Sequence, residues 1–132
     1  MRGHCHCGAV EWRVDGPVTW SALCHCDDCR RIASAPIVAF LGALRCHVTW
    51  QGRPAIYASA PGNERLFCGV CSSALAFRGA RYPDGVFLHA ATMNDPAGYR
   101  PDCYVMTDAQ LAWLKIDDDL PRHPGFNEGK VT

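Results

Sequence analysis

The sequence predicts a mainly β protein with one or two short helices, folded as a single domain over residues 1–132. Two observations support this prediction. Short runs rich in β-branched and aromatic residues are separated by Gly- and Pro-containing turns, which is typical of small antiparallel sheets. Seven of the nine cysteines fall into three tight clusters whose spacing is typical of metal ligands. We therefore expect antiparallel sheets joined by zinc knuckles.

The strand predictions follow the chain from turn to turn. Each run is three to six residues long, and most runs end at a cluster of Gly, Pro or Asn residues. No internal repeat or low-complexity tract divides the series, which favours one domain. The predicted strands are residues 9–14, 18–23, 36–41, 45–50, 55–59, 64–67, 74–78, 86–90 and 104–106.

Two short helices are expected between or after these strands. The first begins at Asp27 and Asp28, which are placed to cap it, and carries residues 29–32. The second covers residues 108–114, with Thr107 or Asp108 as its cap. The tail after Leu120 has few apolar residues, so we expect it to pack as irregular coil.

Composition and charge exclude several classes of function. Thirteen basic residues balance thirteen acidic ones, which gives no attraction to nucleic acid or to an anionic membrane. The longest mostly apolar run, residues 35–44, is too short to cross a bilayer. The N-terminus lacks the apolar segment of a signal peptide, so we expect a reducing, cytoplasmic location and metal binding by the cysteines. A disulfide-rich secreted domain is the rival interpretation, and the oligomeric state stays open.

One cysteine set suits a closed structural zinc site. Cys68-x-x-Cys71 follows a predicted strand, and such a turn directs both sulfurs to one metal. Cys5-x-Cys7 supplies a second pair, because residues two apart on an extended strand share a face. The four sulfurs would bind one zinc ion and join the N-terminus to the middle of the chain.

The remaining cluster, Cys24-x-Cys26-x-x-Cys29, offers three thiolates from one loop. Three protein ligands leave a fourth position open, as in zinc sites that bind a substrate. His25 should point away from the cysteines if the segment is extended. Two alternatives remain. In the first, one of the other cysteine pairs joins Cys68 and Cys71 in a single metal site, and the remaining cysteines are merely buried. In the second, a histidine replaces one sulfur as a ligand.

Three thiolates also indicate a type of chemistry. They donate charge to zinc, so such an ion is less suited to making hydroxide than one held by neutral histidines. It is better suited to holding a substrate thiol as a nucleophilic thiolate. Arg30 and Arg31 follow directly, and arginine binds carboxylates through two parallel hydrogen bonds. A solvated basic pair on a helix is the simpler interpretation of these two residues.

The ordered motifs resemble those of the glutathione-dependent formaldehyde-activating enzyme family, which also includes centromere protein V. The matching segments occur in family order over nearly the whole chain: GHCHCGAVEW, CHCDDCRR, YASAPGNERLFCGVCSSAL, NDPAGYRPDCYV and AWLKIDDDLPRHPG. The resemblance implies a β-tent fold with two zinc sites. It assigns Cys5, Cys7, Cys68 and Cys71 to structural zinc, and Cys24, Cys26 and Cys29 to the zinc where glutathione chemistry takes place.

The chain departs from the family pattern at three places. Ser72 stands where glycine is expected, residues 32–35 lack an expected Gly-Ser pair, and Cys103 stands where histidine is common. Cys103 matters most, because a fourth sulfur would close the second zinc site. We expect Cys103, like Cys46, to be a buried apolar-type cysteine.

Two functions follow from these observations. The first is a carbon–sulfur lyase or synthase that acts on an adduct of a small thiol, namely glutathione, with formaldehyde or a related aldehyde. Cys24, Cys26 and Cys29 would hold and activate the thiol, while Arg30, Arg31 or Arg65 would bind the tripeptide carboxylates. The second is a non-catalytic, protein-binding module with two structural zinc ions. The number of protein ligands at the second metal distinguishes the two.

Overall fold

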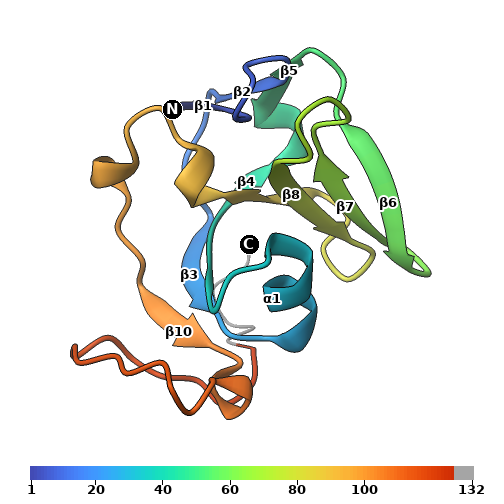
Figure 1. Ribbon diagram of the computed structural model, residues 1–132. Coiled ribbons are helices and arrows are strands. Elements are labelled where there is room, and N and C mark those ends of the chain that lie inside the picture. Colours follow the sequence, from blue (N-terminus) through green and yellow to red (C-terminus); the bar gives the residue numbers. More distant parts are fainter. Residues whose placement is uncertain (127–132) are drawn as a thin grey trace.

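The computed structural model describes residues 1–126, and they form two β-sheets with one α-helix (Figure 1). The mainly β fold class predicted from the sequence is confirmed. The small sheet has the strand order β1-β2-β5, and the large sheet has the order β10-β3-β4-β9-β8-β7-β6. The strand bounds are β1 Arg2–His4, β2 Glu11–Val14, β3 Trp20–Cys24, β4 Val38–Leu44, β5 Val48–Gln51, β6 Ala55–Ala60, β7 Asn63–Phe67, β8 Ala74–Gly79, β9 Gly85–His89 and β10 Cys103–Val105.

The helical elements are short and connect the strands. Helix α1, Asp27–Ala33, joins β3 to β4, as the sequence predicts. It lies on the opposite side of the large sheet from the small sheet, which is at the top of Figure 1. The 3₁₀ turns are η1 Arg45–His47, η2 Ala90–Thr92, η3 Pro96–Gly98 and η4 Thr107–Ala109. In the described part of the chain, no helix combines the length and apolar character needed to cross a bilayer.

All paired strands are antiparallel except β10, which runs parallel to β3.

The alternation of buried and exposed residues along a strand explains how the small sheet packs. In β2, Trp12 and Val14 are buried, whereas Glu11 and Arg13 are exposed, so one face of the strand packs on the core. The remaining predicted strands are present, but the run at residues 45–50 begins as η1 and becomes β5 only at Val48. Strand β1 was not predicted.

The central strands β4 and β9 divide the apolar interior into two clusters. Neighbouring residues on a strand point to opposite faces. Accordingly, Leu41 and Leu88 pack in the cluster beneath the small sheet. Phe40 and Phe87 pack in the other cluster, which contains or contacts all three cysteines of residues 24–29. The large sheet therefore presents an aromatic face to the segment that carries the cysteine triplet.

The second predicted helix is wrong beyond its first turn. Only η4, Thr107–Ala109, is helical, and Gln110 leaves the helical region with φ −57° and ψ 132°. The backbone N–H groups of Met106 and Thr107 donate to carbonyls of the tail, at Gly125 and His123. In the segment that follows, the N–H groups of Gln110 and Leu114 donate to carbonyls three residues back, at Thr107 and Leu111, so the backbone forms separate single turns and no continuous helix. The tail is irregular as predicted, apart from one bridge to β10; its residues 127–132 lie outside the described residues.

Candidate metal centres and active-site cavity

The first cysteine cluster joins two turns that are distant in sequence. The sulfurs of Cys5, Cys7, Cys68 and Cys71 all lie within 4.8 Å of one another. Cys68 follows β7 in a turn closed by the Ser72 N–H, which donates to the Cys68 carbonyl at 2.8 Å. Cys5 and Cys7 also lie in a tight turn, so the expectation that they share a face of an extended strand is wrong.

The spacing of these sulfurs fits zinc. Sulfurs about 2.3 Å from a tetrahedral ion are about 3.8 Å apart. The Cys5 and Cys7 sulfurs are 3.6 Å apart, and those of Cys7 and Cys68 are 3.8 Å apart. Hydrogen bonding from Ser73, through its side chain and then its backbone, lowers the pKa of Cys71 to about 5. The cluster therefore has the four-sulfur donor set of a structural zinc site, and Cys71 is a member that ionises readily.

The second cluster gathers Cys24, Cys26 and Cys29, whose sulfurs also lie within 4.8 Å of one another. Cys24 ends β3, Cys29 is in α1, and Cys26 is the N-cap residue between them. The Cys26 sulfur accepts the backbone N–H of Cys29 at 3.2 Å, which is the role of a capping side chain. The expectation that Asp27 and Asp28 cap this helix is therefore wrong, because Cys26 is the cap.

Hydrogen bonding within the triplet makes its thiols unequal. Hydrogen bonds to Cys26 and Cys29, together with burial, raise the pKa of Cys24 well above its usual range. Hydrogen bonds from Cys24 and Cys29 lower the pKa of Cys26 to about 2, and the charge of Arg65 acts in the same direction. Cys26 is therefore the thiol of this group that ionises first, and a bound cation would favour the thiolate form of all three.

His25 turns away from the sulfurs, as the sequence predicts. It is fully buried, its ring lies 5.7 Å from that of Tyr104, and it is absent from the sulfur group. Its two ring nitrogens have no hydrogen-bond partner among the described residues. Burial, and then the charge of Arg122, lower the pKa of His25, so the ring is held in its neutral form.

The structure distinguishes the three arginines proposed from the sequence. Arg30 and Arg31 both pair with Asp27 on α1, at 2.9 and 3.0 Å. Arg65 comes from β7 and is only 7% exposed. Its guanidinium lies 4.5 Å from the centre of the Phe77 ring, and its Nη1 donates to the Cys29 sulfur at 3.6 Å. Arg65 is thus the arginine that reaches the cysteine triplet.

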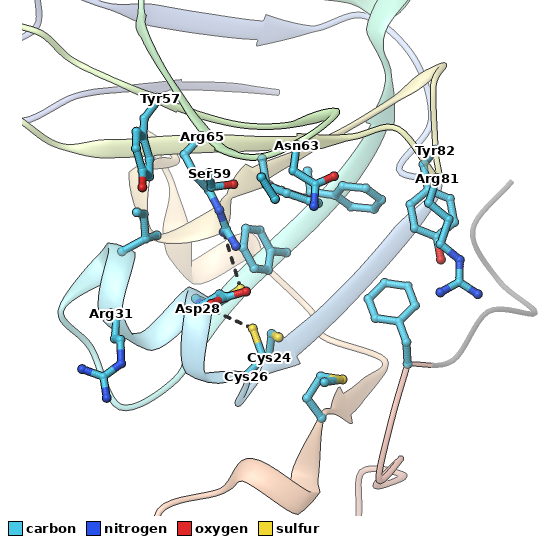
Figure 2. Close-up of a pocket in the computed structure, with 18 of the residues that line it drawn as sticks. Cys24, Cys26, Asp28, Arg31, Tyr57, Ser59, Asn63, Arg65, Arg81 and Tyr82 are labelled. Carbon is cyan, nitrogen blue, oxygen red and sulfur yellow. Dashed lines mark hydrogen bonds between the residues drawn. The ribbon is translucent and has the colours of Figure 1, made fainter.

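A cavity of about 550 Å³ opens beside the triplet (Figure 2). All three cysteines line it, as do Arg31 and Arg65, whereas Arg30 does not. In Figure 2 the side chains of β6 and β7 approach the cysteine loop from the opposite side of the cavity. The sequence analysis missed several polar residues of this lining, namely Tyr57, Ser59, Asn63, Arg81 and Tyr82. It considered Asp28 only as a helix cap, yet Asp28 also lines the cavity.

Aromatic residues complete the cavity, and these also escaped the sequence analysis. Trp20, Phe40, Phe77 and Phe87 occupy strand positions where a sequence pattern indicates core packing. Phe126 comes from the tail, where no periodic pattern points to a site. Strand pairing brings the first four together and packing of the tail adds Phe126, so neither spacing nor composition identified them.

Cys103 remains outside the sulfur group. It is buried on β10 opposite Ala22, two residues along the strand from the register position of Cys24. Among the described residues, the group that surrounds the second candidate metal site contains Cys24, Cys26 and Cys29 alone. Cys46 lies in η1 and is exposed, so the expectation that it is buried is wrong.

The chain is similar to a family model and to two named relatives. The sequence model described as glutathione-dependent formaldehyde-activating enzyme matches residues 1–109. A protein named as an uncharacterized lyase in Schizosaccharomyces pombe is 30% identical, over 77% of this chain and 82% of the relative. A Halomonas elongata protein that carries the name of the same enzyme family is also 30% identical, over 89% of this chain and 81% of the relative.

A solved structure supports the fold independently. The crystal structure of a Rhodobacter sphaeroides protein superposes with a TM-score of 0.61 at 21% sequence identity. The match covers 80% of this chain and the whole of that chain. At this level of identity the likeness concerns the fold alone.

Proposed function

The chain belongs to the glutathione-dependent formaldehyde-activating enzyme family, and from this premise we propose that it is a zinc-dependent carbon–sulfur lyase or synthase. Its substrate is an adduct of a small thiol, glutathione, with formaldehyde or a related aldehyde. One observation carries the proposal: three clustered thiol sulfurs border a cavity of about 550 Å³. A substrate thiol can therefore approach the cluster from the cavity.

The proposed metal sites have different roles. Cys5, Cys7, Cys68 and Cys71 would hold a closed structural zinc, and Cys24, Cys26 and Cys29 would hold a second zinc with one open position. A zinc ion held in this way supplies a positive charge that favours the thiolate form of a bound thiol. Both sites require reduced cysteines, and all nine are free of disulfides, so we place the protein in the reducing cytoplasm.

The side chains around the cavity would bind and orient the thiol. Arg65 supplies a buried positive charge beside the Cys29 sulfur, and Arg31 supplies a second at the cavity edge. In the forward reaction a sulfur–carbon bond forms as the carbonyl π bond breaks. The carbonyl oxygen takes up the proton that the thiol releases, so no oxidant or reductant is consumed. Cleavage of the adduct reverses these changes.

The rival function, a protein-binding module with two structural zinc ions, requires a closed second site. The three-sulfur group and its cavity support the enzyme instead. Cys103, the candidate fourth sulfur, is not in the group. The open arrangement would have no use in a purely structural site.

Exchange spectroscopy by NMR tests the proposed function directly. Thiols add to formaldehyde without a catalyst, so the quantity to measure is the exchange rate between free formaldehyde and its glutathione adduct. We expect this rate to rise in proportion to the concentration of zinc-loaded protein. Cys26→Ser is the matched variant, because serine keeps the helix cap but removes one sulfur. A rate equal to that in buffer would refute the proposal.

A further inference from the structure

Four aromatic side chains form a closed ring of contacts along the cavity wall. The Trp20 ring lies 5.3 Å from Phe87 and 5.0 Å from Phe126. Tyr82 completes the cycle, with its ring 5.6 Å from Phe87 and 5.8 Å from Phe126. Each contact falls within the range for favourable aromatic packing. All four side chains line the cavity that the cysteine triplet borders.

These rings come from separate parts of the fold. Trp20 belongs to β3 and Phe87 to β9, whereas Tyr82 precedes the turn into β9 and Phe126 lies in the tail. Phe77 of β8 extends the wall, with its ring 6.1 Å from that of Phe87. Two guanidinium groups border this aromatic wall: Arg65 lies 4.5 Å from the centre of the Phe77 ring, and Arg81 lies 6.0 Å from the centre of the Tyr82 ring. Between them, Trp20, Phe87 and Phe126 form an apolar, aromatic stretch that suits an apolar ligand group.

The cavity has a different character elsewhere. Asp28 and Arg31 lie on α1, while Asn63 and Arg65 lie on β7 (Figure 2). Charged and amide groups of this kind suit a peptide-like thiol with carboxylates and an ammonium group. The thiol and the aldehyde part of an adduct would therefore meet different surroundings within one cavity.

Formaldehyde does not account for the aromatic wall, because its single carbon carries only hydrogens and covers little apolar surface. We propose that the aldehyde accepted by this site carries a bulky apolar group, preferably an aromatic ring, that packs within the aromatic wall. This inference rests on the proposed function and specifies its substrate class. The balance of the reaction is unchanged: the sulfur bonds to the aldehyde carbon, and the carbonyl oxygen gains the thiol proton.

Stable thioethers separate this inference from the proposed function. S-methylglutathione resembles the formaldehyde adduct, and S-benzylglutathione resembles an adduct of an aromatic aldehyde. Calorimetric titration of the zinc-loaded protein measures the Kd of each, with free glutathione as a third ligand. We expect S-benzylglutathione to bind about tenfold or more tightly than S-methylglutathione, since its ring leaves water.

Two variants locate the benzyl group. Phe126→Ala removes a half-buried tail side chain that lines the wall, and we expect it to abolish most of the benzyl preference. Trp113→Ala is the matched control, because Trp113 is 69% exposed and does not line the cavity; it should keep the preference. Equal binding of the two thioethers would overturn the inference, as would a full preference in Phe126→Ala. Failure of all three ligands to bind would overturn the proposed function as well.

Discussion

The Nη1 atom of Arg65 lies 3.6 Å from the sulfur of Cys29, across the space between β7 and α1. The guanidinium is nearly buried and rests on the Phe77 ring. A buried positive charge next to a thiol favours the thiolate. Hydrogen bonding with Cys24 and the charge of Arg65 lower the pKa of Cys29, but hydrogen bonding with Cys26 and burial outweigh them and raise it to about 11. This contact therefore connects the sheet to the cysteine triplet both structurally and electrostatically.

Replacing Arg65 with methionine should weaken glutathione binding by roughly tenfold or more, since a charge-assisted hydrogen bond is lost. Calorimetric titration of the zinc-loaded variant measures the effect. Arg13→Met is the matched control, because the Arg13 side chain is 53% exposed, pairs with Asp15 and does not line the cavity. We expect a change of less than about threefold there. Equal losses in the two variants would count against a specific role for Arg65.

The two cysteine clusters should differ in their effect on folding. Cys68→Ser should lower the melting temperature strongly, because the first cluster joins segments more than sixty residues apart. Cys26→Ser should have a small effect, because its cluster spans one loop and serine preserves the cap. Both sulfurs accept backbone N–H groups, so the substitutions are matched. Equal loss of stability in both variants would contradict the proposed division of roles.

Ser72 should be a site of backbone strain. Its φ is 64°, in the left-handed region that glycine adopts with little cost, and glycine is what the family resemblance predicts here. Ser72→Gly should therefore raise the free energy of unfolding by about 0.5–1 kcal/mol. The same substitution at Ser59, in strand β6, should lower it. Urea unfolding of both variants measures the difference, and a destabilised Ser72→Gly protein would refute the prediction.

His89 should make the fold sensitive to acid. Burial, and then the charge of Arg65, lower its pKa to about 4, below the value of 6.5 for an ordinary histidine. Above pH 6.5 the ring is neutral in both states and contributes nothing. As the pH falls from 6.5 toward 4, the unfolded chain binds a proton that the folded chain does not, so stability is lost.

Between pH 7.5 and pH 5.5 this loss should be about 1 kcal/mol. His89→Gln should remove that part of the pH dependence, which urea unfolding at the two pH values measures. Any acid release of metal affects both proteins alike, so the difference between their pH profiles isolates His89. Parallel profiles would show that His89 does not titrate in this way.

Local chemistry explains why much of the fold was predictable. The strands alternate buried and exposed residues, as at Trp12 and Arg13, or carry continuous apolar runs when both faces are covered, as in β4. The cysteine clusters were recognised because their short spacings in the sequence are typical of metal ligands. These signals depend on neighbours along the chain.

Long-range pairing explains what the sequence did not reveal. Residues 108–114 have a helical pattern, yet they form only short separate turns, and the residues before them pair with the tail. Likewise, the aromatic wall unites residues as distant as Trp20 and Phe126. Arg65 was predicted as a binding residue, but its contact with Cys29 depends on the pairing of β7 in the large sheet. Such relations follow from tertiary contacts and leave no local pattern.

Cadmium NMR of the metal-substituted protein tests the central claim most directly, because cadmium binds thiolates and its chemical shift reports the number of sulfur ligands. Our account predicts two resonances, one from a four-sulfur site and one from a three-sulfur site made by Cys24, Cys26 and Cys29. Adding glutathione should move only the second resonance, into the four-sulfur range, and Cys26→Ser should abolish that movement. Two four-sulfur resonances before glutathione is added, or no movement when it is, would contradict the account.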